Sequence, residues 1–115
     1  MQTDLPLNPV APDVYVAPQM TPEAMAELAR LGFRAVVNNR PDFEGGPDQP
    51  TSAQVEAAAV AAGLAYRHLP VQGGYQSPEE IAAFGALLAE LPRPLLAFCR
   101  SGARSTKLFL ASGAR

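Results

Sequence analysis

A helix followed by a short strand recurs along this chain, and this alternation is the feature that most constrains its fold. In the first unit, Thr21 and Pro22 form a helix start signal, because threonine caps helix N-termini and proline suits the first helical position. Strong helix formers follow over residues 24–31. Gly32 supplies a left-handed C-cap, and residues 33–37 are a mostly apolar run typical of a strand.

A second unit repeats this pattern. Thr51 and Gln54 have the spacing of a capping box, in which each side chain bonds the backbone of the other residue. They predict a helix over residues 55–62. Gly63 again supplies the C-cap, and residues 64–71 form the strand that follows.

The third unit ends in a continuously apolar strand. Ser77 and Glu80 form another capping box, and residues 95–98 are all apolar, as in a strand buried on both faces. A last helix is predicted over about residues 104–111 and an opening strand over residues 14–16. Strands that alternate with helices form parallel sheets covered by helices. We therefore predict a three-layer α/β fold with a parallel, four- to five-stranded sheet flanked by helices.

Length, charge and cysteine usage limit the class of protein. The 115 residues suit a single domain over 1–115. The net charge of −2 favours neither nucleic acid nor an anionic membrane as a partner, and no apolar stretch is long enough to span a bilayer. One cysteine excludes an internal disulfide, and the N-terminus lacks a signal-peptide pattern, so we expect a cytoplasmic protein. One cysteine and one histidine are too few for a metal site, and no cofactor is expected.

The single cysteine carries the strongest chemical signal. Cys99 directly follows the apolar run 95–98, and the segment Cys-Arg-Ser-Gly-Ala-Arg over residues 99–104 leads into the last predicted helix. Ligands of open parallel sheets bind beyond the carboxyl ends of the strands. A tight loop entering a helix there directs backbone N–H groups inward, and the helix dipole favours an anion. We therefore expect this loop to bind an anion.

Side chains of the loop are expected to activate the thiol. A helix N-terminus and nearby arginines lower the pKa of a cysteine, so Arg100 and Arg104 should favour a Cys99 thiolate. Arg104 can also donate two hydrogen bonds to a bound oxyanion. Gly102 permits a positive φ, which lets the N–H groups converge. The other anion-binding candidates of the loop are Ser101, Ala103 and Ser105. The hydroxyls of the two serines can bond the sulfur or cap the helix.

The loop and its flanking segments resemble known families. The string from Cys99 to Ser105 resembles the active loop of single-domain rhodaneses, which implies a cysteine that carries sulfur as a persulfide. Over roughly residues 12–110 the chain is similar to the phosphatase-like domain of the beta-lactamase-hydrolase-like family, often described as sulfurtransferase-like. The matching segments are residues 32–42, residues 66–71 and the cysteine loop. This resemblance implies a protein tyrosine phosphatase-like fold, close to that of dual-specificity phosphatases.

The length of the cysteine loop separates two chemistries. Phosphatases of that fold place five residues between cysteine and arginine, whereas this chain has four, as in rhodaneses that use thiosulfate. A shorter loop makes a smaller cradle, which a phosphate ester should fit poorly. Two departures agree with this. Phe98 stands where phosphatases usually carry histidine, and Gln72 begins the segment where dual-specificity phosphatases usually place an aspartic general acid.

The long loop over residues 39–50 holds carboxylates that could replace this acid. Asp42 is a candidate catalytic residue, and it also belongs to the family's Asn-Arg-Pro-Asp pattern, so it either takes part in chemistry or shapes the loop. Glu44 could substitute for the acid as well. Arg40 is either a second anion contact or a salt-bridge partner of Asp42.

These observations favour a sulfurtransferase and leave two alternatives open. In the main interpretation, Cys99 takes sulfane sulfur from a small anionic donor (thiosulfate or a persulfide) and passes it to an external thiol acceptor. The first alternative is a cysteine-dependent phosphatase with a phospho-Cys99 intermediate. The second is a non-catalytic anion-binding or regulatory module. The resemblance also implies a metallo-hydrolase partner, and the short segment after the loop suggests a domain that lacks a C-terminal helix.

Overall fold

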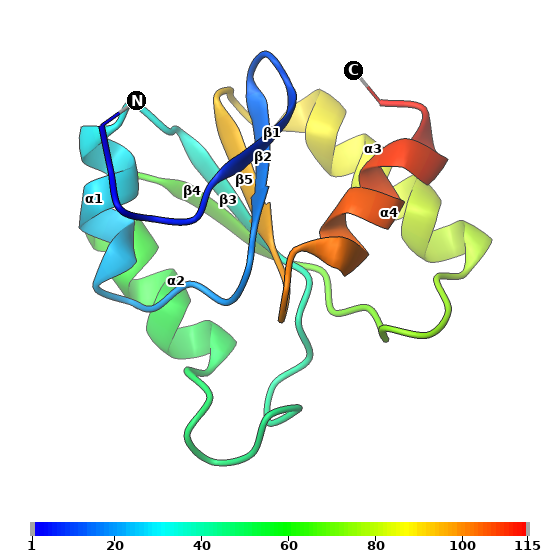
Figure 1. Cartoon of the computed structure of the whole chain (residues 1–115), viewed down its shortest axis with the longest axis horizontal. Coiled ribbons are helices and arrows are strands. Elements are labelled where there is room, and N and C mark those ends of the chain that lie inside the picture. The colour runs from blue at the N-terminus through cyan, green and yellow to red at the C-terminus, as the bar shows by residue number, and fades with distance from the viewer. Residues whose placement is uncertain (1, 115) are drawn as a thin grey trace.

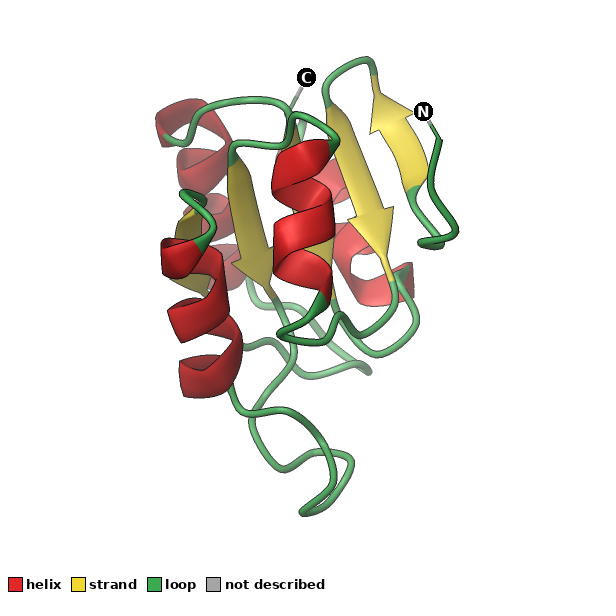
Figure 2. Ribbon diagram, turned by 90° about the vertical axis from the view of Figure 1, so that its left-hand side faces the viewer, coloured by secondary structure: helices red, strands yellow, loops and turns green. Residues whose placement is uncertain are grey.

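A five-stranded sheet lies between two pairs of helices in the computed structural model, which describes residues 2–114 (Figures 1 and 2). Helices α1 and α2 cover one face of the sheet, and α3 and α4 cover the other (Figure 1). The predicted three-layer α/β fold is therefore confirmed. The elements are β1 (Asn8–Ala11), β2 (Val14–Ala17), α1 (Ala24–Arg30), β3 (Ala35–Asn38), α2 (Ser52–Ala61), β4 (Ala65–His68), α3 (Pro78–Glu90), β5 (Leu95–Phe98) and α4 (Ala103–Ser112).

The sheet has the strand order β1-β2-β5-β3-β4. Strands β2, β5, β3 and β4 are parallel to one another, as predicted, but β1 runs antiparallel to β2 at the edge. The predicted parallel sheet is therefore confirmed for four strands, and the antiparallel edge strand is an addition that was not predicted. Sequence reasoning missed β1 because it is short and contains Pro9. A proline weakens the prediction of a strand, although it is tolerated in strands at sheet edges.

Element boundaries follow the capping signals unevenly. The capping boxes at Thr51 and Ser77 form as predicted, and each side chain accepts the N–H of the third following residue. At α1, however, Glu23 occupies the N-cap position. The predicted cap, Thr21, instead closes a turn before the helix, where its hydroxyl oxygen accepts the Ala24 N–H at 3.3 Å. None of the helices within residues 2–114 is long and apolar enough to cross a membrane.

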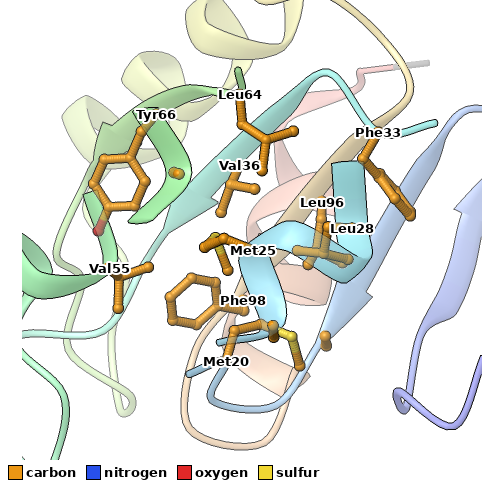
Figure 3. Packing of buried hydrophobic residues seen from close by; sticks show 13 residues of the cluster. Met20, Met25, Leu28, Phe33, Val36, Val55, Leu64, Tyr66, Leu96 and Phe98 are labelled. Carbon is orange, nitrogen blue, oxygen red and sulfur yellow. The ribbon is translucent and has the colours of Figure 1, made fainter. Parts of the chain in front are cut away.

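Two hydrophobic clusters hold the three layers together. The first packs Met25 and Leu28 of α1 against Val36, Leu96 and Phe98 of the sheet (Figure 3). The second lies on the opposite face, between the sheet and helices α3 and α4. Every residue of β3 and β5 is buried, because each strand contributes side chains to both clusters. Burial of one large apolar side chain stabilises a fold by roughly 1.5–3 kcal/mol, so these two strands anchor the molecule.

The chain leaves the carboxyl ends of β3 and β5 in opposite directions. These strands are hydrogen-bonded neighbours with Asn38 opposite Phe98. The segment after β3 leads to α2 on one face, whereas the segment after β5 leads to α4 on the other. Loops that part in this way mark the switch point of an open α/β sheet, the place where such sheets bind ligands. We call this place, between the two loops, the crevice. Cys99 follows β5 directly and is therefore placed at this point.

Replacement of a residue in the central strand tests how far the fold depends on it. We expect Leu96→Ala to lower the free energy of unfolding by about 2–5 kcal/mol, because Leu96 is fully buried and its truncation leaves a cavity. Urea denaturation measures this change. Leu110→Ala is the matched control, since Leu110 is 71% exposed and should change stability by less than about 0.5 kcal/mol. Equal losses in the two variants would contradict this account of the core.

Candidate active site

The segment between β5 and α4 wraps the backbone around the sulfur of Cys99. The Cys99 N–H donates to the Ala17 carbonyl at 3.3 Å, which holds the start of the loop against β2. Gly102 then adopts a φ of +95°, a left-handed conformation that favours glycine. The Gly102 N–H thereby donates to the Cys99 Sγ at 3.1 Å. Helix α4 begins at the next residue, so its positive end faces the sulfur.

The pKa of the Cys99 thiol lies below its ordinary value, as the sequence predicts. Burial alone would raise this pKa, because a charged sulfur loses its hydration. Backbone N–H groups directed at the sulfur outweigh that effect. They belong to Ser105, Ser101, Gly102 and Arg104. Of the two causes that the sequence predicts, the backbone N–H groups at the helix N-terminus lower this pKa, whereas arginine side chains are not among its causes.

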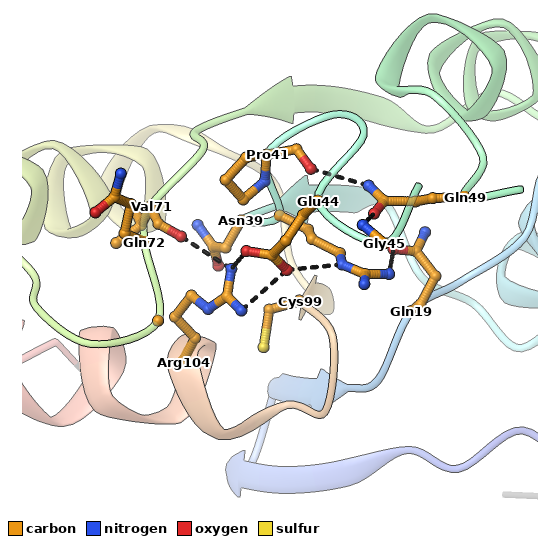
Figure 4. A network of polar contacts seen from close by, with 12 residues as sticks. Gln19, Asn39, Pro41, Glu44, Gly45, Gln49, Val71, Gln72, Cys99 and Arg104 are labelled. Atoms are coloured by element: carbon orange, nitrogen blue, oxygen red, sulfur yellow. Dashed lines mark hydrogen bonds and ion pairs between the residues drawn. The ribbon is translucent and has the colours of Figure 1, made fainter. Parts of the chain in front are cut away.

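Arg104 belongs to the first turn of α4, and its guanidinium group extends from this helix to Val71 and Glu44 (Figure 4). Its Nη1 donates to the Val71 carbonyl at 3.0 Å and to Glu44 Oε2 at 3.0 Å, and its Nη2 donates to Glu44 Oε1 at 3.2 Å. A Cβ at Gly73 would lie 3.3 Å from Arg104 Nη2, so the glycine leaves room for this arrangement. Arg104 thus holds two parallel hydrogen bonds to a carboxylate, the geometry that it would offer to a bound oxyanion.

Arg40 contacts the same carboxylate from the other side. Its Nε donates to Glu44 Oε1 at 2.9 Å, and its Nη1 donates to Gln19 Oε1 at 3.2 Å. The side chains of Arg40 and Arg104 are each 10% exposed. Arg104, and to a lesser degree Arg40, hold the pKa of the Glu44 carboxyl below its usual range. The expected partner of Arg40, Asp42, is therefore replaced by Glu44.

Asp42 bonds the start of α2. Its Oδ1 accepts the Ser52 backbone N–H at 2.7 Å, an interaction that the helix dipole strengthens. Buried Gln49 braces the same loop, because its amide group bonds the Gly45 N–H at 2.7 Å and the Pro41 carbonyl at 2.9 Å. Asp42 therefore shapes the loop that presents Glu44.

Asn39 joins the two sides of the crevice, and the sequence analysis did not single it out. Its side-chain nitrogen donates to the Leu69 carbonyl at 3.1 Å, and its Oδ1 accepts the Ser105 hydroxyl at 2.8 Å. Ser105 Oγ thus bonds Asn39 instead of the predicted sulfur. The two consecutive asparagines that follow the apolar residues 35–37, Asn38 and Asn39, are the sequence signal that could have identified this position.

The remaining loop residues face outward. Arg100 is exposed, and its carbonyl accepts the Gln19 N–H at 3.2 Å. Ser101 is exposed as well, with its hydroxyl oxygen 3.4 Å from the Ala103 N–H. The structure therefore brings together Cys99, Arg104 and Arg40, and it places the Arg100 side chain at the surface.

Comparison with known proteins identifies a family. The family described as "Beta-lactamase hydrolase-like protein, phosphatase-like domain" matches residues 6–115. A curated "Beta-lactamase hydrolase-like protein" of Agrobacterium fabrum is 39% identical over 83 residues, which cover 72% of this chain and 19% of that protein. One of Xylella fastidiosa is 36% identical over 97 residues, which cover 84% of this chain and 22% of that protein. This chain therefore spans about a fifth of these relatives.

A solved structure agrees with this assignment. The crystal structure of a candidate phosphatase of Neisseria meningitidis superposes with a TM-score of 0.82 and is 30% identical in sequence. The match covers 89% of this chain and 72% of that one. The three-layer sheet and helix arrangement is thus shared with phosphatase-like proteins.

The lowered pKa of Cys99 predicts that its thiolate forms at a lower pH than that of an ordinary cysteine. We expect the ultraviolet absorbance of the thiolate to titrate with a midpoint below that of free cysteine, and to be missing in Cys99→Ser. Because the folded-state pKa is lowered, ionisation stabilises the fold above the unfolded-state pKa. This contribution is lost as the pH falls through the folded-state pKa. A midpoint at or above that of free cysteine would contradict the expected stabilisation by backbone N–H groups.

The left-handed glycine at the start of α4 allows a matched test of loop geometry. Gly102→Ala should cost about 1–2 kcal/mol of stability, because L-residues disfavour this conformation. It should also raise the pKa of Cys99, because a shift of residue 102 out of the left-handed conformation would turn its N–H away from the sulfur. Gly113→Ala carries similar strain at the far end of α4 and should leave the Cys99 titration unchanged. Equal titration curves in both variants would show that the geometry of the cysteine loop does not determine the pKa of Cys99.

Proposed function

This chain belongs to the family of phosphatase-like domains of beta-lactamase hydrolase-like proteins, and from this premise we propose that it is a cysteine-dependent phosphatase acting on phosphate monoesters. One observation supports this function above all. The Cys99 sulfur lies at the positive end of α4 and accepts a backbone N–H, while the Arg104 guanidinium beside it already holds an anionic group. A nucleophile and an anion-binding arginine on one loop suit phosphoryl transfer.

The proposed reaction has two steps at Cys99. The thiolate attacks the phosphorus atom, the bond to the leaving oxygen breaks, and the phosphoryl group is carried on Sγ. Water then attacks phosphorus, the S–P bond breaks, and inorganic phosphate leaves with the thiolate restored. The guanidinium of Arg104 and the backbone N–H groups directed at the sulfur, those of residues 101, 102, 104 and 105, hold the phosphoryl oxygens during both steps.

Sulfur transfer is the second candidate function, and one observation favours it. Only four residues separate Cys99 from Arg104. The Gly102 N–H reaches the sulfur within this short loop, so the cradle around Cys99 is small. In this reaction Cys99 would accept a sulfur atom from a small anionic donor and pass it to an external thiol.

Hydrolysis of an aryl phosphate tests the phosphatase directly. We expect the wild-type protein to release phosphate from p-nitrophenyl phosphate and to show a transient mass gain of one phosphoryl group. Cys99→Ser should abolish both signals. Arg104→Lys should lower kcat/KM by about 10²–10³-fold, because lysine cannot form the two parallel hydrogen bonds. Arg67→Lys is the control, since Arg67 pairs with Glu90 at the surface.

The same mass measurement separates the two functions. Incubation with thiosulfate should leave the mass of a phosphatase unchanged. A gain of one sulfur atom that requires Cys99 and is removed by cyanide, without phosphate release from the ester, would overturn the proposed phosphatase in favour of sulfur transfer. A thiol that reacts in neither assay would support the non-catalytic anion-binding module.

A further inference from the structure

Glu44 contacts the arginine of the cysteine loop from a different segment of the chain. Its two carboxylate oxygens accept hydrogen bonds from Arg104 Nη1 and Nη2, and Oε1 also accepts one from Arg40. Figure 4 shows the Glu44 carboxylate beside the guanidinium group of Arg104. The side chain is 28% exposed and belongs to the loop between β3 and α2. An acid group is thus held where an oxyanion of a ligand would bind.

The other acidic candidates near the crevice have different tasks. The Asp42 carboxylate is engaged by the Ser52 backbone N–H. Asp48 lines a surface groove with Pro22 and Gln54, on the side of α1 and α2. The segment after Val71 offers Gln72, which cannot donate a proton as an acid does. Within residues 2–114, Glu44 is the carboxyl group in contact with the anion-binding arginine.

A bound phosphoryl group changes the surroundings of Glu44. Cys99 is 1% exposed, so a substrate reaches the sulfur only when neighbouring side chains move. A dianionic phosphoryl group would compete with Glu44 for the N–H groups of Arg104. The displaced carboxylate would lose a cationic partner and lie beside two negative charges, and both changes favour its protonated form.

We propose that Glu44 is the catalytic residue that donates a proton to the leaving group of the phosphate monoester, an inference that rests on the proposed phosphatase function. As Cys99 Sγ bonds to phosphorus and the P–O bond breaks, the carboxylic acid of Glu44 gives its proton to the departing oxygen. The resulting carboxylate takes a proton from the water that attacks phospho-Cys99. Phosphate leaves, and both the thiolate and the acid are restored.

Two esters with different leaving groups test this role. Phenyl phosphate needs a proton on its leaving oxygen, whereas 2,4-dinitrophenyl phosphate releases a stable anion. We expect Glu44→Gln to lower kcat/KM for phenyl phosphate by about 10²–10³-fold and to change that for the dinitrophenyl ester by less than about tenfold. Glu44→Asp should recover part of the loss, because it retains an acid. Glu56→Gln, the same change of charge on the exposed side of α2, should leave both values unchanged.

Asp42→Asn distinguishes the proton donor from a residue that shapes the loop. It should lower kcat/KM for the two esters by similar factors, because it acts on loop position. Equal losses for both esters in Glu44→Gln would show that Glu44 positions Arg104 and would overturn the proposal. Failure of the wild-type protein to hydrolyse either ester would overturn the proposed phosphatase and this inference with it.

Anion binding supplies a readout that needs no turnover. If a phosphoryl group displaces Glu44 from Arg104, inorganic phosphate should protect Cys99 from alkylation at a concentration about tenfold lower in Glu44→Gln than in the wild-type protein. Protection that requires more phosphate in the variant would mean that the carboxylate holds Arg104 in place. That result would contradict the displacement step.

Discussion

The parallel pairing of β3 with β5 is the constraint on which the rest of the structure depends. The register sets Asn38 opposite Phe98, so Asn39 and Cys99 leave the sheet side by side. The Asn39 N–H donates to the Phe98 carbonyl at 2.8 Å and continues the ladder into the loops. Because alternate residues of both strands belong to the clusters on opposite faces, a one-residue shift of register would move each apolar side chain into the wrong cluster and disrupt its packing. The hydrophobic core therefore determines where the nucleophile is placed.

Backbone groups and charged side chains have different electrostatic roles in the crevice. Backbone N–H groups lower the pKa of the cysteine, whereas the two arginines bind a glutamate. The two cationic side chains thus share one carboxylate, while the thiolate is stabilised by peptide dipoles. Such fixed dipoles need little rearrangement when charge develops during a reaction, which makes them effective in catalysis. A side-chain ion pair can exchange partners, which suits a position that a ligand has to enter.

Local signals in the sequence were sufficient for much of this arrangement. Capping boxes located α2 and α3, and the apolar run before Cys99 identified β5 and the loop that follows it. The cysteine loop could be read because all its parts are contiguous. The partner of Arg40 could not be predicted, because Asp42 and Glu44 both lie close to it in the sequence. Only the conformation of the folded loop determines that Arg40 bonds Glu44. Asn39 and Ser105 lie 66 positions apart, a separation that periodicity and spacing do not relate.

The short first strand has a consequence for the solution behaviour of the chain. Strand β2 carries Val14 and Val16, both almost fully buried, and its outer edge is paired with β1. An unprotected strand edge of this kind is a template on which other chains can add by β-pairing. Pro9 and a register irregularity in β1 interrupt the row of donors that would otherwise be presented outward. A chain that lacks the residues before position 12 would therefore expose the edge of β2 and self-associate by β-pairing. Loss of a segment far from Cys99 would thus change the association state of the protein.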